Sequence, residues 1–592
     1  MKRNYLKPIL TGCLVSLLSL SACTEEYLEK QPIGSISEST LANKSGIKGV
    51  LIGAYSLLDG VGATGGSFWS SPTVLSSMAS DDAHVGTEPN GLLASYEAYT
   101  HDPTSSSTNE RWQFLYAAVQ RTNDVLRLLP KVTELTADEA AQTKAEAIFL
   151  RGVYHFEAAK LWRNVPFVDE SIGYDAGNYN VSNTDPIWPK IEADFKYAAD
   201  NLTPTKSDVG RANKWAAKAF LAKVYLFQQK FTEAKPLLAE IIASGVTSNG
   251  KKYALAEQYF DNFRTDKKHG PEAVFTVQMS VYDGANGSNG NAADMYNGPF
   301  GGPPSCCYGW LQPSFDLVNA YQTDANGLPL IDSYNKNLVT NDQGLQSSAA
   351  FTPYAGTLDA RLDWVVGRRG IPYLDWGIHP GMAWIRQQNT GGPYSVIKNI
   401  AWQARIATDR ENANTNNPYS LIRFADVLLW AAEVEVEIGS LAQAEAYVNQ
   451  IRARAANPAG FVKKYIDNAA PLKGFTNEPA ANYKVGLYTG QFVQKGKEFA
   501  REAVRFERKL ELALEHHRFF DLQRYDNGTG YMATLLNNYL KYEAAVPKYF
   551  NQDYMKGAFF TKGKNELYPI PQAQIDLSTT EGKPTLKQNP GY

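Results

Sequence analysis

The chain has 592 residues, of which 44% are hydrophobic and 20% charged, a composition typical of globular proteins and unlike disordered or collagen-like ones. Its formal net charge of −3, without basic runs, argues against binding nucleic acid through the phosphates. Four cysteines in so long a chain exclude a disulfide scaffold. Aromatic residues reach 12%, and ring faces are common platforms for flat ligands. Composition therefore excludes several classes of protein without naming a function.

Residues 1–22 are predicted to be a lipoprotein signal peptide. A basic start precedes an apolar stretch from Ile9 to Leu20, which is too short to span a bilayer, and the order Leu20-Ser21-Ala22-Cys23 follows. This order resembles the lipobox of bacterial lipoproteins, whose cysteine is acylated and becomes the first residue of the mature chain. We therefore expect Cys23 to carry a lipid anchor. Ordinary cleavage after Ala22 is the alternative.

Helical periodicity dominates the first half of the chain. The predicted helices cover about 40–58, 109–129, 137–162, 187–201, 211–229 and 232–243. Residues 211–244 match the tetratricopeptide spacing of ~34 residues, and a second helix pair is predicted over 420–455. Ala222 and Ala234 stand twelve positions apart in the first pair, as do Ala432 and Ala444 in the second. The repeated spacing favours a shared unit over two unrelated helical hairpins.

A later helix is predicted over 498–525. Glu515, Arg518, Asp521 and Arg524 stand three apart within it, so opposite charges come within reach along one edge and support the fold. The adjacent His516 and His517 lie in the same predicted helix. We interpret them as surface or packing residues.

Two stretches are predicted to be long ordered loops. Residues 60–108 and 280–420 are too rich in Gly, Pro and Asn for long helices, yet too aromatic for disordered linkers. Such loops on a rigid frame are a usual place for a binding site. An extended tail is predicted over 565–592.

The tail carries a family resemblance. LYPIPQAQID followed by LKQNPGY resembles the C-terminus of the SusD/RagB family of outer-membrane nutrient-binding lipoproteins of Bacteroidetes, and CTEEYLEKQPIGSIS resembles the family's mature start. AEAIFLRGVYHFEAAKLWRNVPFV, YSLIRFADVLLWAAEVEVEIG and RFERKLELALEHHRFFDLQR are similar to family blocks in the same order. The resemblance covers nearly the whole mature chain and is weakest in the loops at 60–108 and 280–400.

The resemblance implies a mostly α fold, in which tetratricopeptide-like helix pairs form a superhelical frame and a loop-rich region packs against it. Residues 23–592 would form a single body. Its helical frame would cover about 40–275 and 420–545, its ligand-facing loops about 280–420, and its tail 565–592. The resemblance also implies a protein anchored by lipid in the outer membrane and facing the cell surface. There it would pass a glycan, or a peptide in the RagB branch, to a SusC-like TonB-dependent transporter.

Aromatic and polar residues of the loops are the candidate ligand contacts, because sugar C–H faces stack on Trp and Tyr rings while Asn, Asp and Arg bind the hydroxyls. The first loop supplies Trp69 and Tyr96, and the second supplies Tyr296, Tyr308 and Trp310. A third cluster holds Trp376, Trp384 and Arg386. For each ring, packing of the loop onto the helices is the alternative.

Cys306 and Cys307 are adjacent in the second loop. They could close a vicinal disulfide during passage through the oxidising periplasm, or remain two buried free thiols. The two alternatives have equal standing on sequence grounds.

No motif indicates an enzyme. HExxH, GxSxG and GxxxxGK[ST] are absent from the sequence. The neighbouring acids Asp81-Asp82 and Asp169-Glu170 are poor candidates for a glycosidase pair, because sequence neighbours usually point apart. We interpret them as solvated loop acids, with a structural calcium site as the alternative, and expect no other cofactor.

The leading hypothesis is a non-catalytic surface lipoprotein that captures oligo- or polysaccharide for a partner TonB-dependent transporter. A peptide-capturing RagB-like lipoprotein is the first alternative. A tetratricopeptide-type adaptor that binds a protein in its helical groove is a further one, against which the lipobox and the NPGY tail argue.

Overall fold

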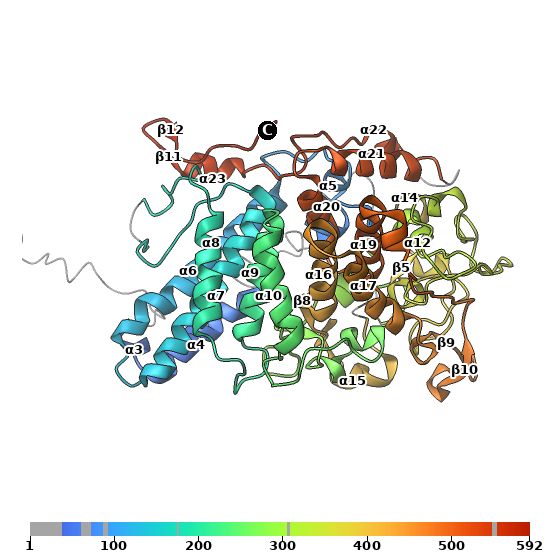
Figure 1. Cartoon of the computed structure of the whole chain (residues 1–592), viewed down its shortest axis with the longest axis horizontal. Coiled ribbons are helices and arrows are strands. Elements are labelled where there is room, and N and C mark those ends of the chain that lie inside the picture. Colours follow the sequence, from blue (N-terminus) through green and yellow to red (C-terminus); the bar gives the residue numbers. More distant parts are fainter. Residues whose placement is uncertain are drawn as a thin grey trace, which may run out of the picture.

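The computed structural model describes residues 38–60, 73–86, 93–174, 177–304, 308–398, 400–546 and 553–592. The signal peptide, Cys23, Trp69 and the Cys306-Cys307 pair lie outside these ranges. Helices dominate both halves of the chain, and the loops between them carry only short strands (Figure 1). Within the described ranges, no helix combines the length and apolar character needed to cross a membrane.

The helices of the N-terminal half are α3 (Glu38–Leu41), α4 (Lys44–Ser56), α5 (Ala94–Glu97), α6 (Ser106–Leu128), α7 (Ala137–Trp162), α8 (Trp188–Asn201), α9 (Lys214–Phe227) and α10 (Phe231–Ser244). Those of the C-terminal half are α16 (Phe424–Ile438), α17 (Leu441–Ala455), α18 (Gln491–Lys495), α19 (Lys497–Glu511), α20 (Arg518–Asp526), α21 (Tyr531–Glu543), α22 (Asp553–Gly557) and α23 (Gln572–Leu577). Between them lie the short helices α11 (Ala293–Asn297), α12 (Phe315–Ala320), α13 (Leu362–Val365), α14 (Gln388–Gly391) and α15 (Ile406–Asp409).

Local sequence signals set several of these helix starts. Thr136 and Glu139 form a capping box at α7, in which each side chain accepts a hydrogen bond from the other's backbone N–H. The Asn213 side chain accepts from the backbone N–H of Ala216 and caps α9, and Ser440 caps α17 in the same way. Helix α7 therefore begins and ends where the periodicity predicts, at residues 137 and 162.

Both predicted helix pairs are confirmed. Ala222 of α9 and Ala234 of α10 are fully buried, and so are Ala432 of α16 and Ala444 of α17. Their small side chains let the helix axes approach closely while larger residues fill the remaining space. Helix α10 packs against α16, which joins the two pairs into one frame.

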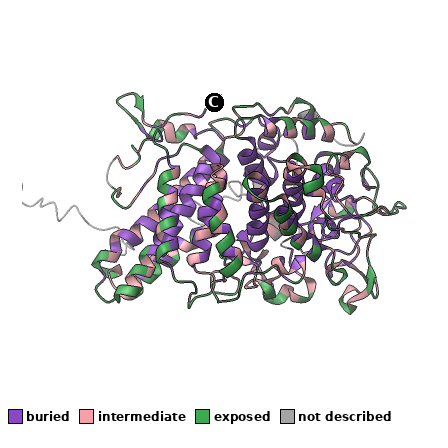
Figure 2. Ribbon diagram, viewed as in Figure 1, coloured by how far each residue is buried: buried purple, intermediate pink, exposed green. Residues whose placement is uncertain are grey.

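The loop-rich region lies at one end of this frame, on the right in Figure 1, around α12, α14 and β5. The strands that the structure describes across the chain form two-stranded antiparallel sheets. The paired strands are β1 (Ala83–Val85) with β3 (Leu311–Pro313), β2 (Ala273–Val277) with β8 (Tyr419–Arg423), β4 (Val366–Gly367) with β5 (Ser395–Val396), β6 (Arg410–Glu411) with β7 (Asn414–Thr415), β9 (Lys463–Tyr465) with β10 (Phe475–Pro479), and β11 (Thr579–Thr580) with β12 (Lys583–Pro584). Buried residues run through the helices and into these loops, so the loops pack as part of the body (Figure 2).

A buried network of charges joins the frame to the loops. Arg423, at the start of α16, contacts Glu272 at 2.7 Å, Glu511 at 2.6 Å and Glu515 at 2.8 Å. Arg361, from the loop region, contacts Glu511 at 2.9 Å. The cations of the network are Arg361, Lys398, Arg423, Arg452 and Arg454, and its carboxylates are Glu272, Asp359, Glu507, Glu511 and Glu515. Five positive charges thus face five negative ones, as buried charges require.

The predicted helix over 498–525 is wrong in its middle. Helix α19 ends at Glu511 and α20 begins at Arg518, and between them Leu514 and His516 have φ of 61° and 66°. The break serves tertiary contacts, because the Leu514 N–H donates to the Asp82 carboxylate at 3.1 Å. The charged residues still support the fold: Arg524 pairs with Asp521 at 2.9 Å within α20.

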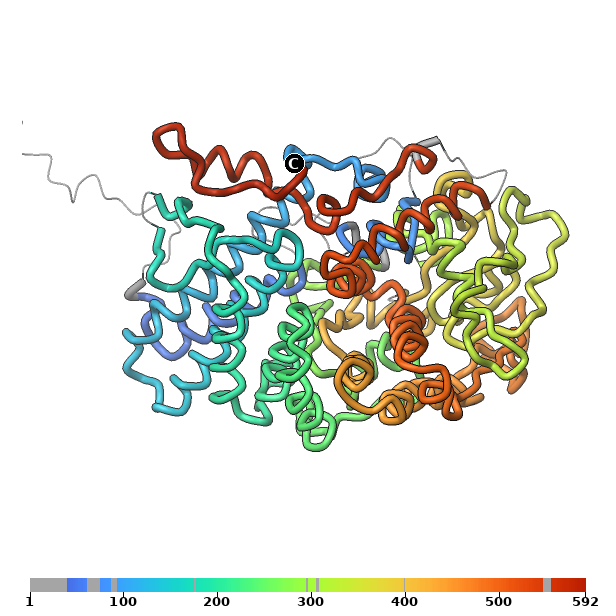
Figure 3. The backbone as a smooth tube through the Cα atoms, turned by 45° about the horizontal axis from the view of Figure 1, so that its top comes forward, coloured from blue at the N-terminus to red at the C-terminus, as the bar shows by residue number. Residues whose placement is uncertain are grey.

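The C-terminal tail crosses the helices of the N-terminal half. The indole N–H of Trp162, the last residue of α7, donates to the Pro569 carbonyl at 2.9 Å. The side-chain amide of Asn589, in the NPGY sequence, donates to the Trp162 carbonyl at 3.0 Å and to the Tyr568 carbonyl at 2.8 Å. Figure 3 shows this red segment running across the top of the molecule, beside the blue segment that precedes α6.

Candidate functional site

Strands β1 and β3 bring the first and second loop regions together. Val85 pairs with Leu311, and the Gly86 N–H donates to the Trp310 carbonyl at 2.7 Å. Gly86 is required there because a Cβ atom would lie 1.9 Å from the Gly309 carbonyl oxygen. The chain on either side of this contact leads into the predicted ligand loops.

Three of the predicted ligand residues form one group of rings. Tyr296 of α11 stacks on Trp310 with centroids 5.0 Å apart and an interplanar angle of 12°. The ring centroid of Tyr308 lies 5.1 Å from that of Tyr296 and 4.6 Å from that of Trp310. Trp310 is 7% exposed, whereas the two tyrosines are half-buried. Burial and the neighbouring Tyr308 raise the pKa of Tyr296, so its hydroxyl keeps its proton at neutral pH.

The third predicted cluster contributes Arg386 and Trp384 to the same place. Arg386 donates from Nη1 to the Tyr308 carbonyl at 3.0 Å, and its guanidinium lies 5.5 Å from the ring of Phe300. Trp384 packs on Gly302, where a Cβ atom would come within 2.7 Å of the indole. The aromatic cluster is defined here as Tyr296, Phe300, Tyr308, Trp310, Trp384 and Arg386.

Phe300 was missed by the sequence reasoning. It is 38% exposed and stands beside Arg386 in the loop sequence NGPFGG. A phenylalanine among glycines and prolines is itself a signal, because no helix or strand there requires a large apolar side chain. That signal could have been used to find it.

Two predicted ligand residues do not join the cluster. Tyr96 of α5 is fully buried and stacks on His101 at 5.0 Å, with Tyr568 of the tail 6.0 Å away. It holds the tail to the core and has no surface to offer a ligand. Trp376 donates its indole N–H to the Ala401 carbonyl at 2.8 Å and packs one loop on another.

The acidic pair Asp81-Asp82 is buried, so its interpretation as solvated loop acids is wrong. Asp81 is paired with Lys509 at 2.7 Å and with Arg518 at 2.7 Å. Burial and the Asp81 charge raise the pKa of Asp82 to about 7. Lys509 and Arg518 thus contact both oxygens of the Asp81 carboxylate. Within the described ranges, no group of three or more His, Cys, Asp and Glu residues is arranged to hold a metal ion.

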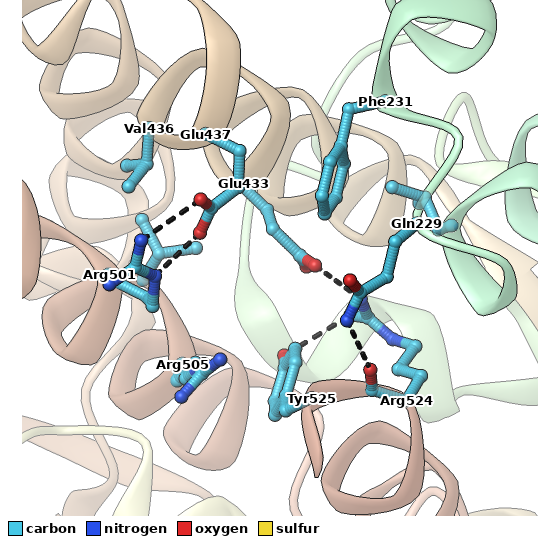
Figure 4. Close-up of a pocket in the computed structure, with 11 residues that line it drawn as sticks. Gln229, Phe231, Glu433, Val436, Glu437, Arg501, Arg505, Arg524 and Tyr525 are labelled. Atoms are coloured by element: carbon cyan, nitrogen blue, oxygen red, sulfur yellow. Dashed lines mark hydrogen bonds and ion pairs between the residues drawn. The ribbon is translucent and has the colours of Figure 1, made fainter. Parts of the chain in front are cut away.

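A polar pocket lies between the α9–α10 turn, α16, α19 and α20 (Figure 4). Arg501 binds both carboxylate oxygens of Glu437, at 2.6 and 3.0 Å, and Arg524 is bonded to Glu433. Arg505 pairs with Glu502 at 3.0 Å on the rim. Each arginine of the pocket has its own carboxylate, so the pocket is a structural junction between helices.

The chain is similar to known proteins along most of its length. The protein-family model described as "SusD family" matches residues 271–592. A second family model, described as "Starch-binding associating with outer membrane", matches residues 26–226. SusD-like protein P25 of Formosa agariphila is 24% identical over 531 residues, which is 86% of this chain and 88% of that protein.

Solved structures share the fold. A laminarin-binding SusD-like protein superposes with a TM-score of 0.63 at 22% identity, over 93% of this chain and 100% of that one. Surface glycan-binding protein A of Bacteroides thetaiotaomicron, in complex with laminarihexaose, superposes with a TM-score of 0.62 at 20% identity, over 92% of this chain and 99% of that one. These two are described by what they bind and not by a reaction. Because a family model matches more than half of the chain, in a region that holds the aromatic cluster, this protein belongs to the SusD family.

Proposed function

We propose that this protein is a non-catalytic surface lipoprotein that captures an oligo- or polysaccharide and delivers it to a SusC-like TonB-dependent transporter. The observation that carries the proposal is the aromatic cluster, in which the packed rings of Tyr296, Tyr308 and Trp310 meet Arg386 of a second loop segment near the surface. Membership of the SusD family supports the same role, since two matching structures are described as binding laminarin or in complex with laminarihexaose.

The chemistry of the aromatic cluster suits a saccharide. Tyr308 and Phe300 present ring edges and faces for sugar C–H groups, and the Arg386 guanidinium supplies donors for hydroxyl groups. The rings are held by packing and backbone hydrogen bonds, including the Trp310 N–H to the Tyr296 carbonyl at 2.9 Å. Such preorganisation reduces the entropy lost on binding.

The anchor and the partner complete the proposal. Acylation of Cys23 would tether the body to the outer membrane on its cell-surface side, and the family description that names the outer membrane supports this address. A tethered capture protein raises the local concentration of ligand for a transporter in the same membrane.

Affinity electrophoresis on a polysaccharide panel that includes laminarin tests the proposal. Tyr308→Ala and Arg386→Ala should each weaken retention of the mature protein about tenfold, equivalent to ~1.4 kcal/mol. Trp69→Ala tests the first loop in the same assay. Phe559→Ala is the matched control, because Phe559 is 63% exposed and lies between α22 and the tail, outside the aromatic cluster. The wild type should release no reducing sugar.

Two outcomes contradict the proposal. Equal retention of the wild type and both cluster variants would remove the aromatic cluster from the site. Binding of peptides but of no polysaccharide would favour a RagB-like peptide carrier.

A further inference from the structure

A hollow distinct from the polar pocket of Figure 4 lies at the opposite end of the molecule from the aromatic cluster. Helix α6 forms one wall, with Trp112, Tyr116 and Gln120 spaced four residues apart. The segment after α7 forms the other wall, with Tyr174, Asn178 and Tyr179. We call these six residues the α6 groove. In Figure 1, α6 lies on the left and the loops around α14 on the right.

The size and lining of the α6 groove are those of a ligand site. Its volume is about 420 Å³, inside the range of ~300–1,000 Å³ typical of small-molecule pockets. Aromatic rings line both walls, and carboxamides and the Arg121 side chain stand among them. Its composition therefore repeats the mixture of rings and hydrogen-bonding groups that suits a saccharide.

Two tyrosines of the α6 groove are unusually exposed. Tyr174 is 67% exposed and Tyr179 is 54% exposed, and among the described tyrosines only Tyr282, at 57%, is comparably exposed. Exposed rings beside a hollow are a common sign of a binding surface. The floor beneath them is rigid, because Trp112 is buried and the Tyr116 hydroxyl donates to the Pro166 carbonyl at 2.8 Å.

The exposed ring of Tyr174 is held in place from one side. Its hydroxyl donates to the Asp124 carboxylate at 2.8 Å, and the Arg127 guanidinium lies 5.4 Å from the ring centroid. Arg127 is itself paired with Asp124 at 2.6 Å. An exposed tyrosine normally samples several rotamers, so these contacts fix a ring that would otherwise move.

Polar groups of the α6 groove remain for a ligand. Asn178 donates one amide N–H to the Gly173 carbonyl at 3.0 Å, and its Oδ1 and other N–H have no partner within the described ranges. The Tyr179 hydroxyl makes no hydrogen bond to the described part of the chain. An acceptor, two donors and two ring faces thus surround one hollow.

We infer that the α6 groove is a second saccharide-binding site, separate from the aromatic cluster and built for an oligosaccharide that stacks on Tyr174 and Tyr179. The inference rests on the proposed capture of glycans. Two sites at opposite ends of one body would bind a long polysaccharide with avidity, because the second contact becomes intramolecular once the first has formed. Hexasaccharides would instead fill the two sites independently.

Isothermal titration calorimetry of the mature chain tests the inference, with laminarihexaose, maltohexaose, xylohexaose and mannohexaose as probes. The wild type should bind two equivalents of at least one probe. The double variant Tyr174→Ala/Tyr179→Ala should bind one equivalent fewer than the wild type. The double variant Tyr308→Ala/Arg386→Ala should lower the affinity of the other site at least tenfold. Tyr174→Phe with Tyr179→Phe retains both rings and should retain the two equivalents, whereas Phe559→Ala should change nothing.

The outcomes separate this inference from the proposed function. One equivalent in the wild type, unchanged by the double alanine variant, overturns the second site and leaves glycan capture intact. Loss of transporter co-purification in that variant, with unchanged hexasaccharide stoichiometry, would make the α6 groove a protein contact and also overturn it. If the wild type binds none of the four probes and no polysaccharide of the panel, both proposals fall together. Unchanged thermal melting confirms that the variants fold, since both tyrosines are exposed.

Discussion

Buried charged residues hold segments of this protein that are hundreds of positions apart. His84 of β1 lies between two carboxylates, with Nδ1 2.6 Å from Glu97 and Nε2 2.8 Å from Glu543. Burial alone would lower the pKa of His84, but the Glu543 and Glu97 carboxylates outweigh it and raise the pKa to about 10. The imidazolium therefore ties the β1 strand beside the aromatic cluster to α5 and α21.

This pairing predicts a pH-dependent stability. Between the unfolded pKa of about 6.5 and the folded pKa of about 10, the folded state holds one proton more at His84. The contribution of His84 is therefore fully present below pH ~6.5 and is lost as the pH rises through 10. It should reduce the free energy of unfolding by up to ~1.4 kcal/mol per pH unit in that window.

His84→Gln should remove this part of the slope, because glutamine does not titrate. Urea unfolding of both proteins at pH 6, 7, 8 and 9 measures it, and the difference in the free energy of unfolding between them should shrink as the pH rises. Parallel pH profiles would contradict the assigned charge of His84. His269→Gln, at a half-buried loop histidine outside the ion pairs, is the matched control.

At the scale of elements, helix pairs are determined by small residues where two helices face each other. Ala444 of α17 is fully buried against the frame, whereas Ala446, two residues along the same helix, is exposed. Alanine and leucine both favour helix, so a change between them tests packing with little change in propensity. The same reasoning applies to Ala222 and Ala234 of the first pair.

Ala444→Leu should lower the free energy of unfolding by ~1–3 kcal/mol, because a close-packed interface cannot take the added atoms without shifting its neighbours. Ala446→Leu should change it by less than ~0.5 kcal/mol. Chemical unfolding followed by circular dichroism compares the two variants. Equal effects would show that the helix pair does not depend on close approach at residue 444.

At the scale of the whole molecule, the C-terminal tail joins the end of the sequence to its first third. Asn589 donates to the carbonyls of Trp162 and Tyr568 and is itself buried. Asn183, in the segment after α7, donates to the Lys587 carbonyl at 2.9 Å, and its side-chain oxygen accepts from the Lys587 N–H at 2.9 Å. The last residues of the chain therefore stabilise the first third of the chain, including α7 and the segment that follows it.

Asn589→Ala should destabilise the whole protein by ~1–3 kcal/mol, because it leaves two buried carbonyl groups without their donor. Lys583→Ala, at an exposed position of β12, is the control and should have little effect. Differential scanning calorimetry should show the Asn589 variant melting at a lower temperature in the same cooperative transition. A transition confined to the tail would instead indicate that the tail unfolds independently of the frame.

Much of the helical frame could be predicted from sequence, because helix periodicity and caps act over a few residues. For that reason helix α7 follows its predicted bounds. The alanines of the two helix pairs are buried between the helices, as their spacing predicts. The break between α19 and α20 could not be predicted, since the local sequence favours helix. The break is accompanied by a contact with Asp82, which lies more than 400 positions away and accepts the Leu514 N–H.

The candidate site, too, could be predicted in part from local sequence, while the rest depended on the tertiary structure. Sequence alone placed Tyr296, Tyr308 and Trp310 in one predicted ligand loop, because aromatic residues cluster there among glycines and prolines. It could not separate Tyr96, which is buried under the tail, from these residues, nor add Phe300 and Arg386 to one cluster.

The sequence by itself determined the family, the helix pairs and the aromatic character of the loops, since each depends on residues close together in the chain. Only the tertiary structure decided which rings share a surface and which acids are neutralised in the interior. It also revealed that α6 and the segment after α7 enclose a second hollow. The physical reason is that burial and charge pairing depend on segments that are distant in sequence. Their proximity is created by the packing of the whole chain.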